Sequence, residues 1–320
     1  MNEIPFDPFF LFKTPFRQTI FGSIFHSIIG PKSEKRIITL KDQDKLAFEV
    51  ITPKKWKEKD LTVVLIHGLC GSHKSPALVR LAKKLKIKNI RSVRVNLRGC
   101  GSGSGLAKKP HYSADPEDIL EVLKLLKKES SSPIILVGFS LGGNIVLKMV
   151  GDIEEEAKKY VKNVIALSPP VDIKLSVELF EKEENKLYLK YFTKLLKEDI
   201  KFLKKKFPEF SNIFIPEDFT FTEFNNFFVV SFLGLKDVEE YYKKCSSKYV
   251  LSNIKVPCKI LFSKDDPIVS YLGLEGVNLP ENIQVFLTKK GGHLGYIGSL
   301  KDKRGFFWLD NILLDWILNN

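Results

Sequence analysis

The strongest constraint on the fold of this 320-residue chain is a serine set between two glycines where a predicted strand meets a predicted helix. The apolar run 133–137 predicts a buried strand, Gly-x-Ser-x-Gly occupies residues 138–142, and residues 143–148 predict a helix. Such a junction is a strained turn that needs small flanking residues and points the serine hydroxyl away from the sheet. We therefore predict that Ser140 is a nucleophile. The backbone N–H of Leu141, at the helix N-terminus, is placed to bind the oxygen of an attacked carbonyl group.

A general base for this serine is indicated by the positions of the histidines. His293 is the only histidine after Ser140, and it lies in a glycine-rich segment behind the predicted strand 283–288. The other four histidines precede the serine. The chain order of serine, acid and histidine is that of α/β-hydrolases, so we assign the base to His293.

Two adjacent aspartates compete for the acid that would orient this histidine. Residues 258–263 predict a strand, and Asp265 and Asp266 follow in the loop at its end. A carboxylate there can accept the Nδ1–H of His293 and stabilise the imidazolium. Hydrolases of this fold commonly carry the acid three residues before an apolar valine, which favours Asp266. Asp172, behind an earlier strand, is a more distant alternative.

A second donor for the carbonyl oxygen is expected after the predicted strand 61–66. His67, Gly68 and Leu69 follow this strand, at the position where the fold carries its oxyanion loop. Gly68 lets the backbone turn inward, so the N–H of Leu69 is the candidate donor. His67 is interpreted as a structural residue of the loop.

Composition limits the other classes of function. The net charge of +13 comes from lysine far more than arginine, and no nucleic-acid-binding motif accompanies it, so we predict no nucleic-acid partner. Weak contact with an anionic membrane surface stays open. No transmembrane segment or secretory leader is predicted, and the four cysteines lack disulfide-like or metal-like spacing. We expect a cytoplasmic protein with free thiols, no metal and no cofactor.

The remaining chain alternates predicted strands and helices, which indicates one mostly parallel sheet flanked by helices. Residues 35–40 and 45–51 predict a hairpin, 76–86 a helix, 92–97 and 162–168 strands, and Asp115 caps another helix. The glycine-rich segment 98–105 has no phosphate-binding lysine and is interpreted as a flexible loop.

Two further segments are assigned around this single domain. Residues 1–34 are interpreted as an N-terminal extension that wraps it. Residues 172–254 are too long for a simple connection and predict a helical cap insertion. Within it, 186–207 predicts an amphipathic basic helix, which either packs over the domain or covers an acyl pocket, with Phe192 and Leu196 as tentative substrate contacts.

These motifs resemble the YheT-like family of α/β-hydrolases, which is related to eukaryotic acylglycerol and phospholipid lipases. The resemblance runs nearly end to end and rests on short matches throughout the chain. These are Gln18-Thr-Ile20, His67-Gly-Leu-Cys-Gly71, Asn96-Leu-Arg-Gly-Cys100, Gly138-Phe-Ser-Leu-Gly-Gly-Asn144, Thr222-Glu-Phe-Asn225, Glu240-Tyr-Tyr242, Asp265-Asp-Pro267 and Gly291-Gly-His-Leu-Gly295.

The resemblance implies a serine hydrolase of carboxylic esters with Ser140, Asp266 and His293 as its triad. An acyltransferase with the same triad and a non-catalytic binding protein are the alternatives. The chain departs from the family pattern at Phe16, at the transposed pair His111-Tyr112 and at Asn225, and we expect no counterpart of the eukaryotic membrane anchor. These departures weaken the transfer of substrate identity but leave the triad positions unaffected.

Overall fold

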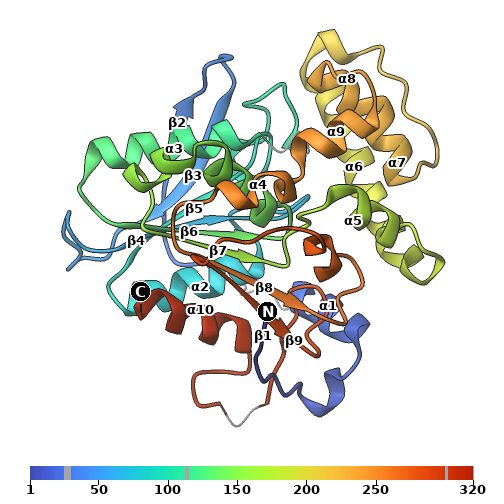
Figure 1. Cartoon of the computed structure of the whole chain (residues 1–320). Helices are drawn as coiled ribbons and strands as arrows, with labels where there is room; N and C mark the ends of the chain where they lie inside the picture. The colour runs from blue at the N-terminus through green and yellow to red at the C-terminus, as the bar shows by residue number, and fades with distance from the viewer. Residues whose placement is uncertain (25–29, 112–114, 300–301, 320) are drawn as a thin grey trace.

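One twisted sheet forms the centre of the molecule (Figure 1). The computed structural model describes residues 1–24, 30–111, 115–299 and 302–319, and within these ranges nine strands pair in the order β1-β9-β8-β7-β6-β4-β5-β3-β2. The strands are β1 (Asn2–Glu3), β2 (Glu34–Thr39), β3 (Lys45–Ile51), β4 (Thr62–Ile66), β5 (Arg91–Val95), β6 (Ile134–Phe139), β7 (Asn163–Leu167), β8 (Cys258–Ser263) and β9 (Ile283–Thr288). Only the β2–β3 and β3–β5 pairs are antiparallel, so the prediction of a mostly parallel sheet is confirmed.

Helices cover both faces of this sheet. The α-helices of the described residues are α1 (Pro15–Ile24), α2 (Pro76–Ile87), α3 (Pro116–Glu129), α4 (Leu141–Asp152), α5 (Ile173–Phe180), α6 (Lys186–Lys206), α7 (Phe221–Phe224), α8 (Val230–Leu233), α9 (Val238–Cys245) and α10 (Trp308–Leu318). Helices α3 and α4 lie on one face, and α2 and α10 lie on the other (Figure 1). The fold is therefore the expected α/β arrangement of a sheet between two helical layers.

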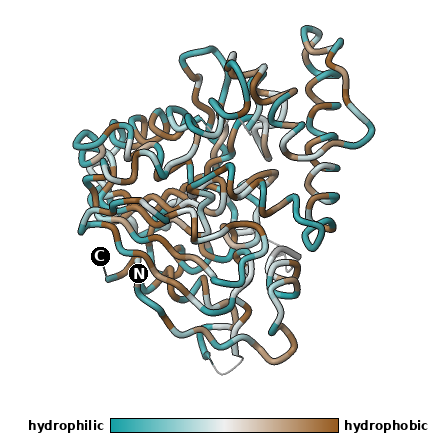
Figure 2. Tube along the Cα trace, turned by 45° about the vertical axis from the view of Figure 1, so that its right-hand side comes forward, coloured by the Kyte–Doolittle hydropathy of each residue, from teal (hydrophilic) through white to brown (hydrophobic). Residues whose placement is uncertain are grey.

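The two-residue period of the central strands explains how both faces are buried. In β4, Val64 and Ile66 pack into the core that contains α3 and α4, whereas Val63 and Leu65 pack into the core that contains α2 and α10. Successive side chains of a strand point to opposite faces, and both sets here are apolar, as in strands buried on two sides. Figure 2 shows the apolar residues gathered in this central region.

The chain between β7 and β8 forms helices α5 to α9, which we call the helical insertion. In Figure 1 they lie together at one end of the molecule, beyond the carboxyl ends of the parallel strands. The predicted amphipathic helix is present as α6, and a π-helical turn, Asn225–Val229, continues α7 into α8. The sequence did not indicate that turn.

The segment after β5 differs from its prediction as a flexible loop. The Arg98 guanidinium is buried and binds the carboxylates of Asp42, Asp44 and Asp118. Three carboxylates from two other parts of the chain thus hold the loop at its first residue, and a short 3₁₀ helix, Gly101–Gly103, follows. Glycine content alone suggested mobility, but the buried charge network opposes it.

The N-terminal residues belong to the sheet and its helical layer. Strand β1 adds to the edge of the sheet in parallel with β9, and α1 packs beside α2. Helices long and apolar enough to cross a membrane do not occur in the described ranges.

Candidate active site

Ser140 occupies the turn between β6 and α4. Its backbone has a φ of 52° and a ψ of −121°, a strained conformation for a residue other than glycine. A Cβ on Gly142 would approach the His67 carbonyl oxygen to 2.4 Å, and one on Gly138 would approach the Gly142 oxygen to 2.3 Å. Only glycine therefore permits the close backbone approach that forms this turn.

His293 lies between this serine and a buried carboxylate. Its Nε2 is 2.9 Å from Ser140 Oγ, and its Nδ1 is 2.8 Å from Asp266 Oδ2. The other oxygen of Asp266 accepts the backbone N–H groups of Ile268 and Val269, at 2.9 Å each. The Asp266 carboxylate is thus held by the loop after β8 while one oxygen faces the imidazole. This arrangement can move a proton from the serine hydroxyl to the histidine.

The two other aspartates considered from the sequence are engaged elsewhere. Asp265 Oδ1 accepts hydrogen bonds from Ser263 Oγ at 2.6 Å and from the Gly292 N–H at 2.9 Å. Asp172 caps α5 and pairs with Lys248. Asp265 therefore braces the loop that carries His293, whereas Asp172 has a structural role at the start of the helical insertion.

The loop after β4 runs directly against the serine. A Cβ on Gly68 would lie 3.0 Å from the Ser140 Cβ, and Leu69 and Leu141 both line the space around the hydroxyl. His67 is buried, with Nδ1 2.7 Å from the Gly68 oxygen and Nε2 accepting the Leu97 N–H at 3.0 Å. Burial lowers the pKa of His67 to about 4, so the ring is neutral and ties the loop to the segment that follows β5.

A cavity of about 540 Å³ opens at the serine. The core domain contributes Ser140, His293 and the loop after β4, and the helical insertion contributes apolar walls from α5, α6, α7 and α9. The lining residues from the insertion are Ile173, Ser176, Val177, Phe180, Tyr191, Phe192, Leu195, Phe221, Phe224, Asn225 and Tyr241, of which only Ser176 and Asn225 are not apolar or aromatic. A mostly apolar cavity with few polar groups beside the hydroxyl suits a substrate with an apolar portion.

The two residues of α6 assigned tentatively to substrate are placed differently. Phe192 lines the cavity, but Leu196 is completely buried in the core and is not among the lining residues. Leu195 lines the cavity instead. Phe192 and Leu195 are three residues apart and therefore lie on the same side of α6, whereas Leu196 is turned toward the core.

The N-terminal segment holds the loop of His293, a role that the sequence did not reveal. Thr19 Oγ1 accepts the backbone N–H of His293 at 2.9 Å. Beside it, the buried Gln18 side chain donates to the Ile297 carbonyl oxygen at 3.1 Å and accepts the Ile297 N–H at 2.7 Å. The short match Gln18-Thr-Ile20 was the only available signal, and it carried no spatial information.

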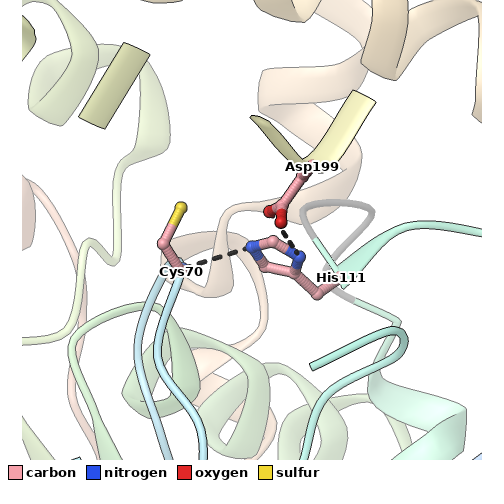
Figure 3. A group of neighbouring side chains, drawn as sticks. All are labelled: Cys70, His111 and Asp199. Atoms are coloured by element: carbon pink, nitrogen blue, oxygen red, sulfur yellow. Dashed lines mark hydrogen bonds and ion pairs between the residues drawn. The ribbon is translucent and has the colours of Figure 1, made fainter. Parts of the chain in front are cut away.

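Among the described residues, one group of metal-ligand type lies near the cavity (Figure 3). Cys70, His111 and Asp199 place their possible ligand atoms within 4.8 Å of one another. Residues 112–114, which complete the transposed motif, lie outside the described residues. The four cysteines are free, as the sequence predicted.

Comparisons with known proteins identify a matching family and several relatives. The family described as alpha/beta hydrolase fold matches residues 62–299. The chain is 27% identical over 260 residues to a protein of Escherichia coli (strain K12) named "Putative esterase YheT", covering 80% of this chain and 76% of that protein. It is 24% identical to a Saccharomyces cerevisiae monoacylglycerol lipase, over 77% and 56% of the two chains.

The structure also superposes on solved esterases. The Pyrococcus furiosus esterase Pf2001 matches with a TM-score of 0.55 and 19% identity, covering 89% of this chain and 93% of that one. At this identity the match supports the fold alone.

Proposed function

Because the chain belongs to the α/β-hydrolase fold family, whose model matches most of its length, we propose that it is a serine hydrolase that cleaves carboxylic esters. The observation that carries this proposal is the line of two hydrogen bonds from Ser140 through His293 to Asp266. The named relatives, an esterase and a monoacylglycerol lipase, support the same reaction class.

The reaction would proceed through an acyl-enzyme. Ser140 Oγ attacks the ester carbonyl carbon as its proton passes to His293 Nε2. Asp266 accepts the Nδ1–H, keeps the ring in the required tautomer and stabilises the imidazolium. The proton then passes from Nε2 to the leaving alkoxide oxygen, and the alcohol departs. A water molecule deprotonated by the same nitrogen attacks the acyl-enzyme, and the acid leaves as Ser140 Oγ recovers its proton.

The negatively charged oxygen of each tetrahedral intermediate needs hydrogen-bond donors directed at it. We assign these to the N–H groups of Leu69 and Leu141, since both residues line the cavity at the serine. Leu141 starts α4, so the partial positive charge of the helix N-terminus adds to its N–H. Removal of one such donor typically costs about 2.7–4 kcal/mol of transition-state stabilisation.

The part of the substrate that fills the cavity would be apolar. We propose that the helical insertion, residues 172–254 by our sequence assignment, acts as a cap and that Phe192 contacts the acyl chain or an apolar alcohol. Leu195 joins it in this role, and Leu196 supports α6 from the core side.

Contact with an anionic lipid surface is proposed for the outer face of the same insertion. Phe214 and Phe227 are 80% and 59% exposed, and the same insertion exposes Lys201, Lys205 and Lys206 of α6. Exposed aromatic groups and lysines are the residue types that suit the boundary of an anionic bilayer. Sedimentation with phosphatidylserine vesicles should carry the protein down at low salt and release it at high salt, and phosphatidylcholine vesicles serve as the control.

We further propose that the enzyme acts in the cytoplasm, where its four free thiols would stay reduced. An acyltransferase would use the same three side chains but pass the acyl group to an alcohol instead of water. Product analysis with and without added alcohol separates the two reactions.

Labelling with a fluorophosphonate tests the proposed nucleophile directly. The wild-type protein should be labelled at Ser140, and Ser140→Ala should remove both labelling and about 10⁶-fold of kcat while the fold is retained. Ser176→Ala is a matched control because Ser176 also lines the cavity. An unlabelled wild-type protein that is folded by circular dichroism would instead support a binding protein without catalysis.

A further inference from the structure

The group drawn in Figure 3 joins three separate segments at the edge of the cavity. Cys70 follows Leu69 in the loop after β4, His111 precedes α3, and Asp199 lies on α6 of the helical insertion. Cys70 has a φ of 54°, an unfavourable backbone conformation for a residue other than glycine. An external contact is therefore needed to hold the loop at this position.

His111 supplies that contact. Its Nε2 lies 3.2 Å from the backbone nitrogen of Cys70. A peptide N–H can only donate, so Nε2 must be the unprotonated nitrogen of the ring. Burial lowers the pKa of His111 far below its ordinary value, which keeps the ring neutral and places its one proton on Nδ1.

Asp199 faces this second nitrogen. Its Oδ2 is 3.8 Å from His111 Nδ1, an electrostatic contact longer than a hydrogen bond. A carboxylate at Nδ1 favours the tautomer with the proton there, because the alternative would turn a lone pair toward the negative oxygen. In the same tautomer Nε2 carries the lone pair that accepts the Cys70 N–H.

This proton placement argues against a metal at the three side chains. A metal bound to His111 Nδ1 would shift the ring proton to Nε2. The Nε2–H would then face the Cys70 N–H, and two donors cannot form a hydrogen bond. A metal on Nε2 would displace that N–H from its acceptor. Either binding mode gives up the contact that stabilises the strained loop.

We propose that His111 and Asp199 are positioning residues that fix the oxyanion loop through the Cys70 N–H. Leu69 is bonded directly to Cys70, so the orientation of its N–H toward the carbonyl oxygen depends on this contact. The inference rests on the proposed ester hydrolysis and adds to it a second acid–histidine pair that acts on the backbone.

The His111–Asp199 pair also connects α6, which lines the cavity, with the oxyanion loop. Helix α6 carries Asp199 together with Phe192 and Leu195, which line the cavity. A substrate chain packed against these two residues holds α6 in place, and with it the carboxylate opposite His111. Binding of the apolar portion thereby favours the loop geometry needed in the transition state.

Kinetics of three variants test the pair. His111→Leu removes the acceptor and should lower kcat about 10- to 100-fold with little change in KM, since a misplacement of about 1 Å can cost about 10²-fold. His111→Gln can present its amide oxygen near the Nε2 position and should restore most of kcat. Asp199→Ala should lower kcat in the wild type but have little further effect in His111→Gln, because the amide has no tautomer to set.

Two control variants separate this positioning role from a general effect of charge and from a role of the thiol. Glu198→Ala makes the same charge change on an exposed neighbour in α6 and should leave kcat unchanged. Cys70→Ala keeps the backbone N–H, so its loss of kcat should be much smaller than that of His111→Leu. A loss in Cys70→Ala equal to that in His111→Leu would overturn the proposal in favour of a role for the thiol, as in a metal site.

Measurements on the wild type distinguish a failure of the positioning pair from a failure of the proposed function. Fluorophosphonate labelling of wild-type Ser140 with equal kcat in the wild type and His111→Leu would refute the positioning pair while leaving the proposed function intact. Absence of labelling and of ester hydrolysis in the wild type would refute both. Circular dichroism and thermal unfolding of each variant show that the comparison is made between folded proteins.

Discussion

Replacing Gln18 by methionine should lower the stability of the protein and also disturb the placement of His293, the proposed catalytic base. The wild-type amide is completely buried and makes three hydrogen bonds, to Phe12 O at 2.7 Å, to Ile297 O at 3.1 Å and from Ile297 N at 2.7 Å. Methionine has a similar length but makes none of them. The change therefore removes the polar contacts with little loss of volume.

The size of the effect follows from which backbone groups lose their partners. The Ile297 carbonyl oxygen keeps the Phe9 N–H at 3.0 Å, so it remains paired. The buried Ile297 N–H is left without its acceptor, which costs about 1–3 kcal/mol, and the partly buried Phe12 oxygen adds up to about 1 kcal/mol. We expect the free energy of unfolding to fall by about 1–4 kcal/mol.

Urea denaturation and ester hydrolysis measure the two consequences. Thr19 adjoins Gln18 and binds the His293 N–H, so kcat should fall about 10-fold while KM changes little. Arg17→Met on the exposed side of α1 is the matched control and should change neither quantity appreciably. Full stability and full kcat in Gln18→Met would refute the view that the N-terminal segment braces the catalytic loop.

Further variants probe the triad, the cavity wall and the buried histidine of the oxyanion loop. Asp266→Asn should reduce kcat by about 10⁴-fold, and Asp265→Asn, which alters only a brace of the His293 loop, should reduce it far less; the reverse order in steady-state kinetics would exchange their roles. Phe192→Asn should flatten the rise of kcat/KM with ester chain length, whereas Leu196→Asn should mainly lower stability in thermal unfolding. The lowered pKa of His67 predicts an acid-sensitive fold, because the unfolded chain takes up the proton below about pH 6.5 and the folded one only near pH 4. His67 alone should account for a fall of about 3 kcal/mol in the unfolding free energy between these values, so the fall should be about 3 kcal/mol smaller in a His67→Gln variant than in the wild type.

Local patterns carried most of the sequence-based prediction. The turn at Ser140 depends on neighbouring residues alone, so the glycines and the flanking apolar runs were sufficient to predict the strand, the turn and the helix. His293 could be selected because few histidines compete with it. The sheet and its hairpin followed from strand patterns in the same way.

The sequence could not show which of two adjacent side chains points toward the site. Asp265 and Asp266 are adjacent in one loop, and only the folded backbone decides which carboxylate faces the imidazole. Leu195 and Leu196 belong to the same apolar face by pattern, yet one lines the cavity and the other lies in the core.

Contacts between distant parts of the chain were equally inaccessible. Gln18 and Ile297 are 279 positions apart, and no local signal predicts their pairing. The bond between His111 and Cys70 likewise joins separate loops. The buried ion pairs of Arg98 show the same difficulty, since their partners lie on both sides of it in the sequence.

The pairing of β1 with β9 joins segments that the ribosome synthesises far apart in time. Strand β1 and α1 emerge long before β9 and the loop of His293, which they hold. Strand β1 must therefore stay without this partner until β9 has also emerged. A nascent chain can fold its central strands early, yet the proposed catalytic base is braced only after β9 and the loop behind it are made, so ester hydrolysis should be absent from ribosome-bound intermediates that end before β9.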